Sequence, residues 1–259
     1  MSHIASVFQS SRKALIAYIT VGYPDIEATE KIAAVLAASG CDIIELGIPF
    51  SDPLADGATI QRASFRALRQ GVTPETCLEA ASRLSAKIAT PLVFMTYYNP
   101  VFNFGLEAFC RRCAGSGISG LIIPDLPPEE ASELAEAARR YEIDLIYLLA
   151  PTSPDGRIGI AAERSRGFIY LTSLTGVTGA RQSLPPDLDK FITRVRAQAT
   201  QPLCVGFGVS NPEQAGRIAG IADGVIVGSR LLELVEEDPG LSLLKDFTLS
   251  LRKAIDLSE

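Results

Sequence analysis

The feature that most restricts the fold of this chain is a repeated alternation of short apolar runs with segments of helical periodicity. Segments 26–38 and 129–140 place apolar residues on one helical face, and the segment 211–219 begins with the capping residue Asn211, followed by Pro212 at a first-turn position. Eight runs between such segments have the length of buried parallel strands; they cover 15–21, 43–47, 91–97, 120–124, 143–149, 167–171, 202–206 and 224–228. Eight such units in 259 residues predict an α/β fold, a closed (β/α)8 TIM barrel, over an open doubly wound sheet.

The remaining sequence predicts one continuous barrel with extra helices. The segment 241–255 is expected to be the last helix, and the absence of a linker or low-complexity segment predicts a single domain over residues 1–259. No apolar stretch approaches the roughly 20 residues of a membrane span. The polar segment 1–12 has no signal-peptide core. We therefore expect a cytoplasmic protein, or a plastid protein if a leader was removed.

Charge and rare residues exclude several classes of function. The formal charge is −6, from 24 Lys and Arg against 30 Asp and Glu, which argues against nucleic acid or an anionic membrane as partner. His3 is the single histidine, so a Ser–His–Asp triad or a histidine-ligated metal centre is not expected. Five cysteines include a C-x-x-C at Cys110 and Cys113. It is either a redox or metal motif or two small residues on one helix face.

A pair of carboxylates follows the second expected strand. Glu45 lies in the apolar run 43–47, near its C-terminal end, where barrel enzymes place their active sites. A buried glutamate needs a partner, a raised pKa or a chemical role. Asp56, in the loop 49–57, is positioned to turn back over the barrel mouth. Two carboxylates in different environments can divide acid and base roles. The alternative for Glu45 is a structural salt bridge.

Glycines mark the ends of the last three expected strands. Barrels often bind phosphate at the loops after strands seven and eight, where glycines let backbone N–H groups approach the anion. Gly208 and the pair Gly228–Ser229 stand at these two ends and predict a phosphate site. The segment 174–186, with its Gly and Thr content, predicts a lid that closes over the site. The alternative is an ordinary crossing loop.

Several motifs together resemble one enzyme family over nearly the whole chain. The most specific is E-L-G-I-P-F-S-D-P-L-A-D-G at 45–57. The others occur in family order: A-Y-I-T-V-G-Y-P-D at 17–25, Y-Y-N-P at 97–100, P-D-L-P at 124–127, G-V-T-G at 176–179, G-F-G-V-S at 206–210 and G-S at 228–229. With these motifs the chain resembles the alpha subunit of tryptophan synthase.

The resemblance implies a lyase that cleaves indole-3-glycerol phosphate by a retro-aldol reaction, giving indole and D-glyceraldehyde 3-phosphate. It implies that Glu45 transfers protons, that Asp56 holds the indole N–H, and that Tyr170 is a catalytic tyrosine near the glycerol chain. Further residues are expected to bind substrate through the indole cavity, the lid or the phosphate loops: Tyr18, Phe94, Tyr97, Thr178, Gly179, Phe207, Gly208, Gly228 and Ser229. For Tyr18, Phe94 and Tyr97, simple barrel packing is an equal alternative.

The resemblance also implies a partner. In an α2β2 tetramer, a beta subunit receives the indole and joins it to serine with pyridoxal phosphate, and this chain itself binds no cofactor and no metal. The loop 49–54, with Asp52 and Pro53, is the expected contact. Three alternatives stay open: another phosphate-binding barrel of aromatic amino-acid biosynthesis, a freestanding indole-producing lyase, and a non-catalytic barrel that activates a partner.

Overall fold

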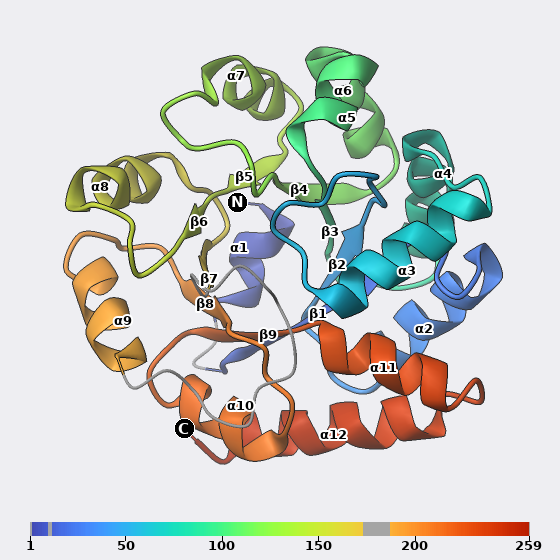
Figure 1. Cartoon of the computed structure of the whole chain (residues 1–259). Helices are drawn as coiled ribbons and strands as arrows, with labels where there is room; N and C mark the ends of the chain where they lie inside the picture. The colour runs from blue at the N-terminus through green and yellow to red at the C-terminus, as the bar shows by residue number, and fades with distance from the viewer. Residues whose placement is uncertain (1, 10–11, 173–186, 259) are drawn as a thin grey trace.

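A parallel sheet curled into a barrel forms the centre of the molecule (Figure 1). The structure is a computed structural model, and it describes residues 2–9, 12–172 and 187–258. Within them the strand order is β5-β4-β3-β2-β1-β9-β8-β7-β6, and every pairing is parallel. The strands are β1 Ala14–Thr20, β2 Ile43–Gly47, β3 Leu92–Met95, β4 Ile118–Ile122, β5 Asp144–Ile146, β6 Leu148–Leu149, β7 Ile169–Thr172, β8 Leu203–Gly206 and β9 Gly224–Val227.

The two ends of the strand order, β5 and β6, are consecutive in the chain and are separated by Tyr147 alone. The Tyr147 N–H bonds to the Ser165 hydroxyl at 3.3 Å, whereas its carbonyl accepts the Tyr170 N–H at 3.0 Å. The chain therefore changes neighbours at this residue, from β4 to β7. The barrel prediction is confirmed, and the fifth expected strand is divided into two short pieces.

Apart from the first, the helices surround the barrel in a ring (Figure 1). Their bounds are α1 His3–Val7, α2 Ile26–Ala38, α3 Ala58–Arg69, α4 Pro74–Ser85, α5 Tyr98–Phe104, α6 Leu106–Gly115, α7 Ser132–Arg140, α8 Asp155–Arg164, α9 Leu188–Arg196, α10 Pro212–Ala219, α11 Ser229–Glu237 and α12 Ser242–Asp256. The expected segment 26–38 is α2, and Asn211 caps α10 as its sequence predicts. The extra helices include α1 and paired helices after β2, β3 and β9. No helix in the described ranges is long and apolar enough to cross a membrane.

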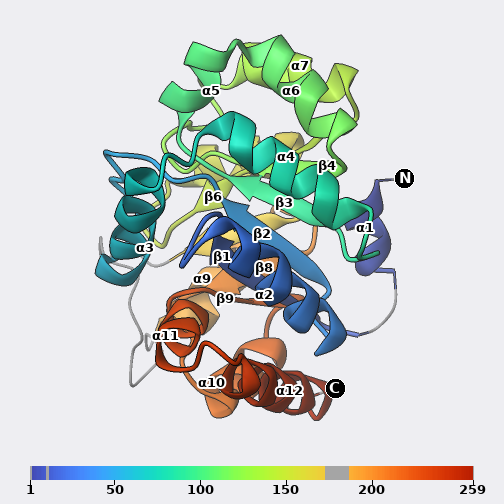
Figure 2. The ribbon, with the colours of Figure 1, turned by 90° about the vertical axis from the view of Figure 1, so that its right-hand side faces the viewer.

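Side chains alternate between the barrel interior and the layer beneath the helices. The interior holds one compact apolar cluster, which consists of Ile4, Ala14, Ile16, Ile43, Val93, Ile122, Ile146, Phe168, Cys204 and Ile226. Ile4 belongs to α1, which closes the end of the barrel opposite α3 (Figure 2). Because this end is filled and closed by apolar packing, the other end is left to form a cavity.

The C-x-x-C pair lies on α6, where Cys110 and Cys113 are both buried against the outer core. Burial raises the pKa of the Cys110 thiol to about 11, which makes a reactive thiolate unfavourable. All five cysteines are free thiols, and no cluster in the described part of the chain is arranged to hold a metal ion. The structure therefore favours the interpretation of Cys110 and Cys113 as packing residues.

An ion-pair network fastens the closed end of the barrel. The Arg252 guanidinium, on α12, donates to the Asp42 carboxylate and to the Lys13 carbonyl, each at 2.9 Å, and lies 2.5 Å from Asp256. Asp42 also accepts the Leu15 N–H at 2.8 Å. One buried cation therefore joins the last helix to the starts of β1 and β2.

We expect Arg252→Ala to lower the free energy of unfolding by about 3–5 kcal/mol, because it removes one partner of a buried pair. The control is Arg140→Ala, which removes an ion pair to Glu107 whose two side chains are more than half exposed. That change should cost at most about 1 kcal/mol. Urea unfolding measures both variants, and equal losses would contradict the role given to Arg252.

Candidate active site

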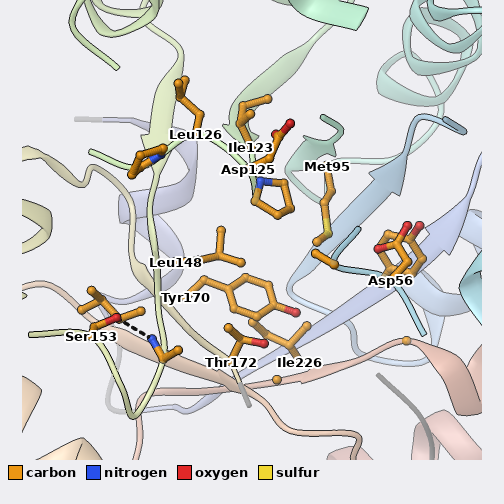
Figure 3. A pocket seen from close by; sticks show the side chains of 18 of the residues that line it. Asp56, Met95, Ile123, Asp125, Leu126, Leu148, Ser153, Tyr170, Thr172 and Ile226 are labelled. Carbon is orange, nitrogen blue, oxygen red and sulfur yellow. Dashed lines mark hydrogen bonds between the residues drawn. The ribbon is translucent and has the colours of Figure 1, made fainter. Parts of the chain in front are cut away.

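A cavity of about 540 Å³ opens at the C-terminal end of the barrel (Figure 3). Its wall comes from strand ends and loops all round the barrel. The apolar part includes Ile60, Met95, Ile123, Leu148 and Ile226, and the polar part includes Asp56, Asp125, Ser153, Tyr170, Thr172 and Ser229. An apolar pocket with a few placed polar groups is typical of a small-molecule site.

Glu45 lies on β2 just beneath this cavity and is fully buried. The alternation along β2 turns its side chain into the barrel, next to Tyr18 on the neighbouring strand β1. Neither carboxylate oxygen accepts a hydrogen bond from the described residues. Burial therefore raises the pKa of Glu45 to about 8. At neutral pH the group is mainly protonated, so the salt-bridge alternative for Glu45 is not supported.

Asp56 forms part of the cavity wall and is 8% exposed. Its backbone is anchored on both sides, since its N–H bonds to the Pro53 carbonyl at 3.3 Å and its carbonyl accepts the Gln61 amide at 2.8 Å. Burial raises the pKa of the carboxyl to about 6, and a hydrogen bond from the Tyr97 hydroxyl opposes that rise. Asp56 is thus mainly ionised at pH 7, while Glu45 is mainly protonated.

Tyr97 stands behind Asp56 rather than in the cavity wall. Its hydroxyl accepts the Ala55 N–H at 2.9 Å, and its ring stacks on Phe50 with centroids 5.4 Å apart. It is also the residue that precedes α5. Tyr97 therefore holds the loop that carries Asp56, a supporting role that the expectation of a cavity-lining residue did not include.

The glycines of β8 and β9 lie together at one side of the cavity, as the phosphate prediction requires. Gly206, Gly208, Gly228 and Ser229 all form part of its wall. Gly208 has a φ of 72°, and Gly228 precedes the first turn of α11, whose unpaired N–H groups favour an anion. The Phe207 side chain is buried in the outer core, so only its backbone is near the site.

Two tyrosines cross the barrel interior at the bottom of the cavity, each above a glycine of the next strand. A Cβ atom on Gly47 would lie 2.1 Å from the Tyr18 hydroxyl, and one on Gly206 would lie 2.6 Å from the Tyr170 hydroxyl. Tyr18 and Tyr170 both line the cavity. Burial and the neighbouring Glu45 carboxyl raise the pKa of Tyr170, so this phenol stays protonated.

Phe94 does not line the cavity, so the alternative of barrel packing describes it. It packs outward against Phe109 of α6, with ring centroids 6.4 Å apart. The reason is the alternation along β3: Val93 and Met95 face inward, and Met95 is the residue in the wall. Because inward-facing residues recur at every second position of a strand, counting two residues on from Val93 would have identified Met95 as the wall residue.

Other wall residues had no assigned role in the sequence, among them Ile123, Leu148 and Ile226. Each lies at or next to the C-terminal end of a strand. The position of the strand ends, together with the alternation of side chains along each strand, could therefore have identified them as wall residues. Asp125 belongs to the P-D-L-P motif and accepts the Tyr98 N–H at 2.8 Å. The expected site residues Thr178 and Gly179, and the expected lid 174–186, lie outside the described residues.

Comparison with known proteins agrees with this geometry. A family model described as tryptophan synthase alpha chain matches residues 4–251. The tryptophan synthase alpha chain of Dehalococcoides mccartyi is 59% identical over 99% of this chain and 100% of its own length. That of Geobacter sulfurreducens is 45% identical over 98% and 99%.

Solved structures agree as well. A chain in the structure of Mycobacterium tuberculosis tryptophan synthase superimposes with a TM-score of 0.93 and 43% identity, covering 98% of both chains. The tryptophan synthase alpha chain of Legionella pneumophila gives a TM-score of 0.91 at 33% identity, covering 99% and 98%. The chain belongs to the tryptophan synthase alpha chain family.

Proposed function

We propose that Glu45 and Asp56 carry out the reaction of this family on a substrate bound in the barrel cavity. A tryptophan synthase alpha chain is a lyase that cleaves indole-3-glycerol phosphate to indole and D-glyceraldehyde 3-phosphate, and the indole passes to a beta subunit for L-tryptophan synthesis. The observation that carries the proposal is the placement of two carboxyls at one cavity: Asp56, mainly ionised at pH 7, in its wall, and Glu45, mainly protonated, beside the wall residue Tyr18.

The substrate binds in the cavity in one orientation. The phosphate meets the backbone N–H groups at Gly208, Gly228 and Ser229, where α11 begins. The indole ring lies against the apolar wall, and its N–H donates to the Asp56 carboxylate. The glycerol chain then spans the middle of the cavity, beside Tyr170 and above Glu45.

The protonation states suit the chemistry. Protonated Glu45 delivers a proton to indole C3, while the Asp56 carboxylate stabilises the positive charge that develops on the ring nitrogen. The Glu45 carboxylate so formed takes the proton of the side-chain hydroxyl as the carbon–carbon bond breaks. The hydroxyl carbon becomes the aldehyde, and Glu45 returns to its protonated state. Tyr170 supports the glycerol chain as this bond is lost.

We infer that this chain needs neither cofactor nor metal for that step. The reaction uses proton transfer and charge stabilisation alone, and no lysine lines the described part of the cavity for a pyridoxal phosphate linkage. That cofactor belongs to the beta subunit. We further propose that residues 1–259 act as one domain in the cytoplasm, as the bacterial source of the relatives suggests.

We propose that the loop 49–54 and α5 together form the contact with a beta subunit in an α2β2 tetramer. The loop and the helix line a shared groove of about 480 Å³, which includes Phe50 and Asn103. Leu54 is 85% exposed, and Phe102 on α5 is 59% exposed. Asp52 and Pro53 lie in the same loop, three to four residues before Asp56. Pressure from a partner on this loop would therefore reach Asp56 directly.

Glu45→Gln should lower the rate of indole formation by about 10²–10⁴-fold, because an amide cannot transfer the proton. Asp56→Asn should lower it by a similar factor, because an amide cannot offset the charge on the ring nitrogen. Indole release from indole-3-glycerol phosphate, with and without a beta subunit, is the measurement. Glu27→Gln, at an exposed glutamate, is the control. Activity within threefold of wild type in Glu45→Gln would exclude Glu45 from proton transfer.

Gly228→Val should abolish the binding of glycerol 3-phosphate, since its side chain would occupy the space of the anion beside Tyr18. A Cβ atom at residue 228 already lies 3.3 Å from the Tyr18 ring. Gly115→Val, at a glycine with open space around it, is the matched control. Calorimetry that finds unchanged affinity in folded Gly228→Val protein would place the phosphate elsewhere.

Pro53→Ala and Leu54→Ser should weaken activation by a beta subunit. The concentration of beta subunit that gives half-maximal activation should rise about tenfold, equivalent to about 1.4 kcal/mol of binding free energy. Leu257→Ser removes an equally exposed leucine at the closed end of the barrel and should leave activation unchanged. The cleavage rate is titrated with beta subunit for each variant. If wild type itself is not activated, the freestanding lyase becomes the better description.

A further inference from the structure

Tyr18 is fixed in position by the backbone of two neighbouring strands. Its hydroxyl lies against Gly47 of β2, and its ring lies against Gly228 at the end of β9. The side chain is 6% exposed, and that exposed part faces the cavity. The phenol therefore has a defined place at the bottom of the site, beside Glu45 on the neighbouring strand and in the same cavity wall as Asp56.

The Tyr18 hydroxyl has only a weak partner in the free protein. It lies 3.3 Å from the Thr20 hydroxyl, a long distance for a bond between two hydroxyls. Burial raises the pKa of Tyr18, and the strongest effect of any charge on it comes from the Asp56 carboxylate. The phenol thus keeps its proton and stands ready to donate it in a hydrogen bond to an anion.

Asp56 has a matching need for donors. A carboxylate offers about four acceptor positions, and the side-chain hydrogen bond to Asp56 among the described residues comes from Tyr97. The nearby wall is apolar, with Ile60 and Met95. The Asp56 carboxylate acts on two further phenols, Tyr18 on β1 and Tyr170 on β7, and Glu45 on β2 acts on the same two phenols. When substrate displaces water, an ionised Asp56 depends on protein donors.

We propose that Tyr18 is a positioning residue whose hydroxyl turns from Thr20 to donate to the ionised Asp56 carboxylate. Two phenols then hold this group, Tyr97 from behind the wall and Tyr18 from within the cavity. The remaining acceptor positions of Asp56 face the indole N–H. This inference rests on the proposed role of Asp56, and it adds a residue that tunes the charge of Asp56 without touching the bond that breaks.

The test begins with the pH profile of kcat, which reports the groups of the substrate complex. Wild type should give a bell, because Asp56 must be ionised and Glu45 protonated. The basic limb is expected near pH 8, and the acidic limb below pH 6, since the pKa of about 6 for Asp56 belongs to the state in which Tyr18 contacts Thr20. Tyr18→Phe removes a donor to the ionised form, so the pKa of Asp56 rises and the acidic limb moves up by about one pH unit. At the pH of the wild-type acidic midpoint, kcat should fall roughly fivefold. The basic limb should not move.

The control Tyr147→Phe removes another buried phenol, which faces the outer core, and should leave the profile unchanged. In the Asp56→Asn background, Tyr18→Phe should not move the acidic limb further, because the carboxylate whose charge it stabilises is gone. An unmoved acidic limb, or an equal shift in the Asp56→Asn background, would overturn the inference.

A titration by carbon NMR, with labelled aspartate and a saturating substrate analogue that cannot be cleaved, reads the pKa of Asp56 without turnover. The same upward shift in Tyr18→Phe is expected there, and an unchanged pKa overturns the inference even if wild type releases no indole. Failure of the proposed function would show instead as an inactive wild type, or as full activity in Glu45→Gln.

Discussion

Glu45 is a carboxyl enclosed in a barrel whose interior is otherwise filled by apolar side chains, and the arrangement of the site follows from its burial. Taking a charged carboxylate out of water costs several kcal/mol, so the group keeps its proton at neutral pH. Asp56, with a phenol donor from Tyr97, keeps its charge instead. One kind of functional group, the carboxyl, thus yields an acid and an anion at one cavity, because only Asp56 has a hydrogen-bond donor among the described residues.

A barrel that carries such a group at one end needs secure packing at the other. Asp42 and Asp223 repeat one arrangement there: each lies just before a strand, and each accepts the backbone N–H that begins the neighbouring strand, at 2.8 Å. Arg252 pairs with the first aspartate and Arg196 with the second. Together with α1, which closes that end, these contacts stabilise the closed end of the barrel, while the candidate active site occupies the open end.

The sequence predicted what depends on local pattern. Apolar runs located the strands within a few residues, and α2 was predicted without error because Asp25 caps its start and Gly40 follows its end with a φ of 95°. Prediction from the sequence failed where the position of a residue depends on partners that are distant in the chain. The facing of Phe94 stayed open between cavity lining and barrel packing, because the sequence does not show which side of β3 meets the barrel interior. The division of the fifth strand depends on a hydroxyl at Ser165, 18 residues further along.

The same limit explains why Tyr18 and Tyr97 could be named as site residues but not given different roles. Both are tyrosines near strand ends, and their sequence contexts are alike. What separates them is the space left by glycines elsewhere in the chain. Gly47 and Gly228 admit the Tyr18 ring to the cavity floor, whereas Tyr97 stacks on Phe50 behind the wall. The absence of two Cβ atoms on neighbouring strands therefore decides which phenol can reach Asp56 from the substrate side.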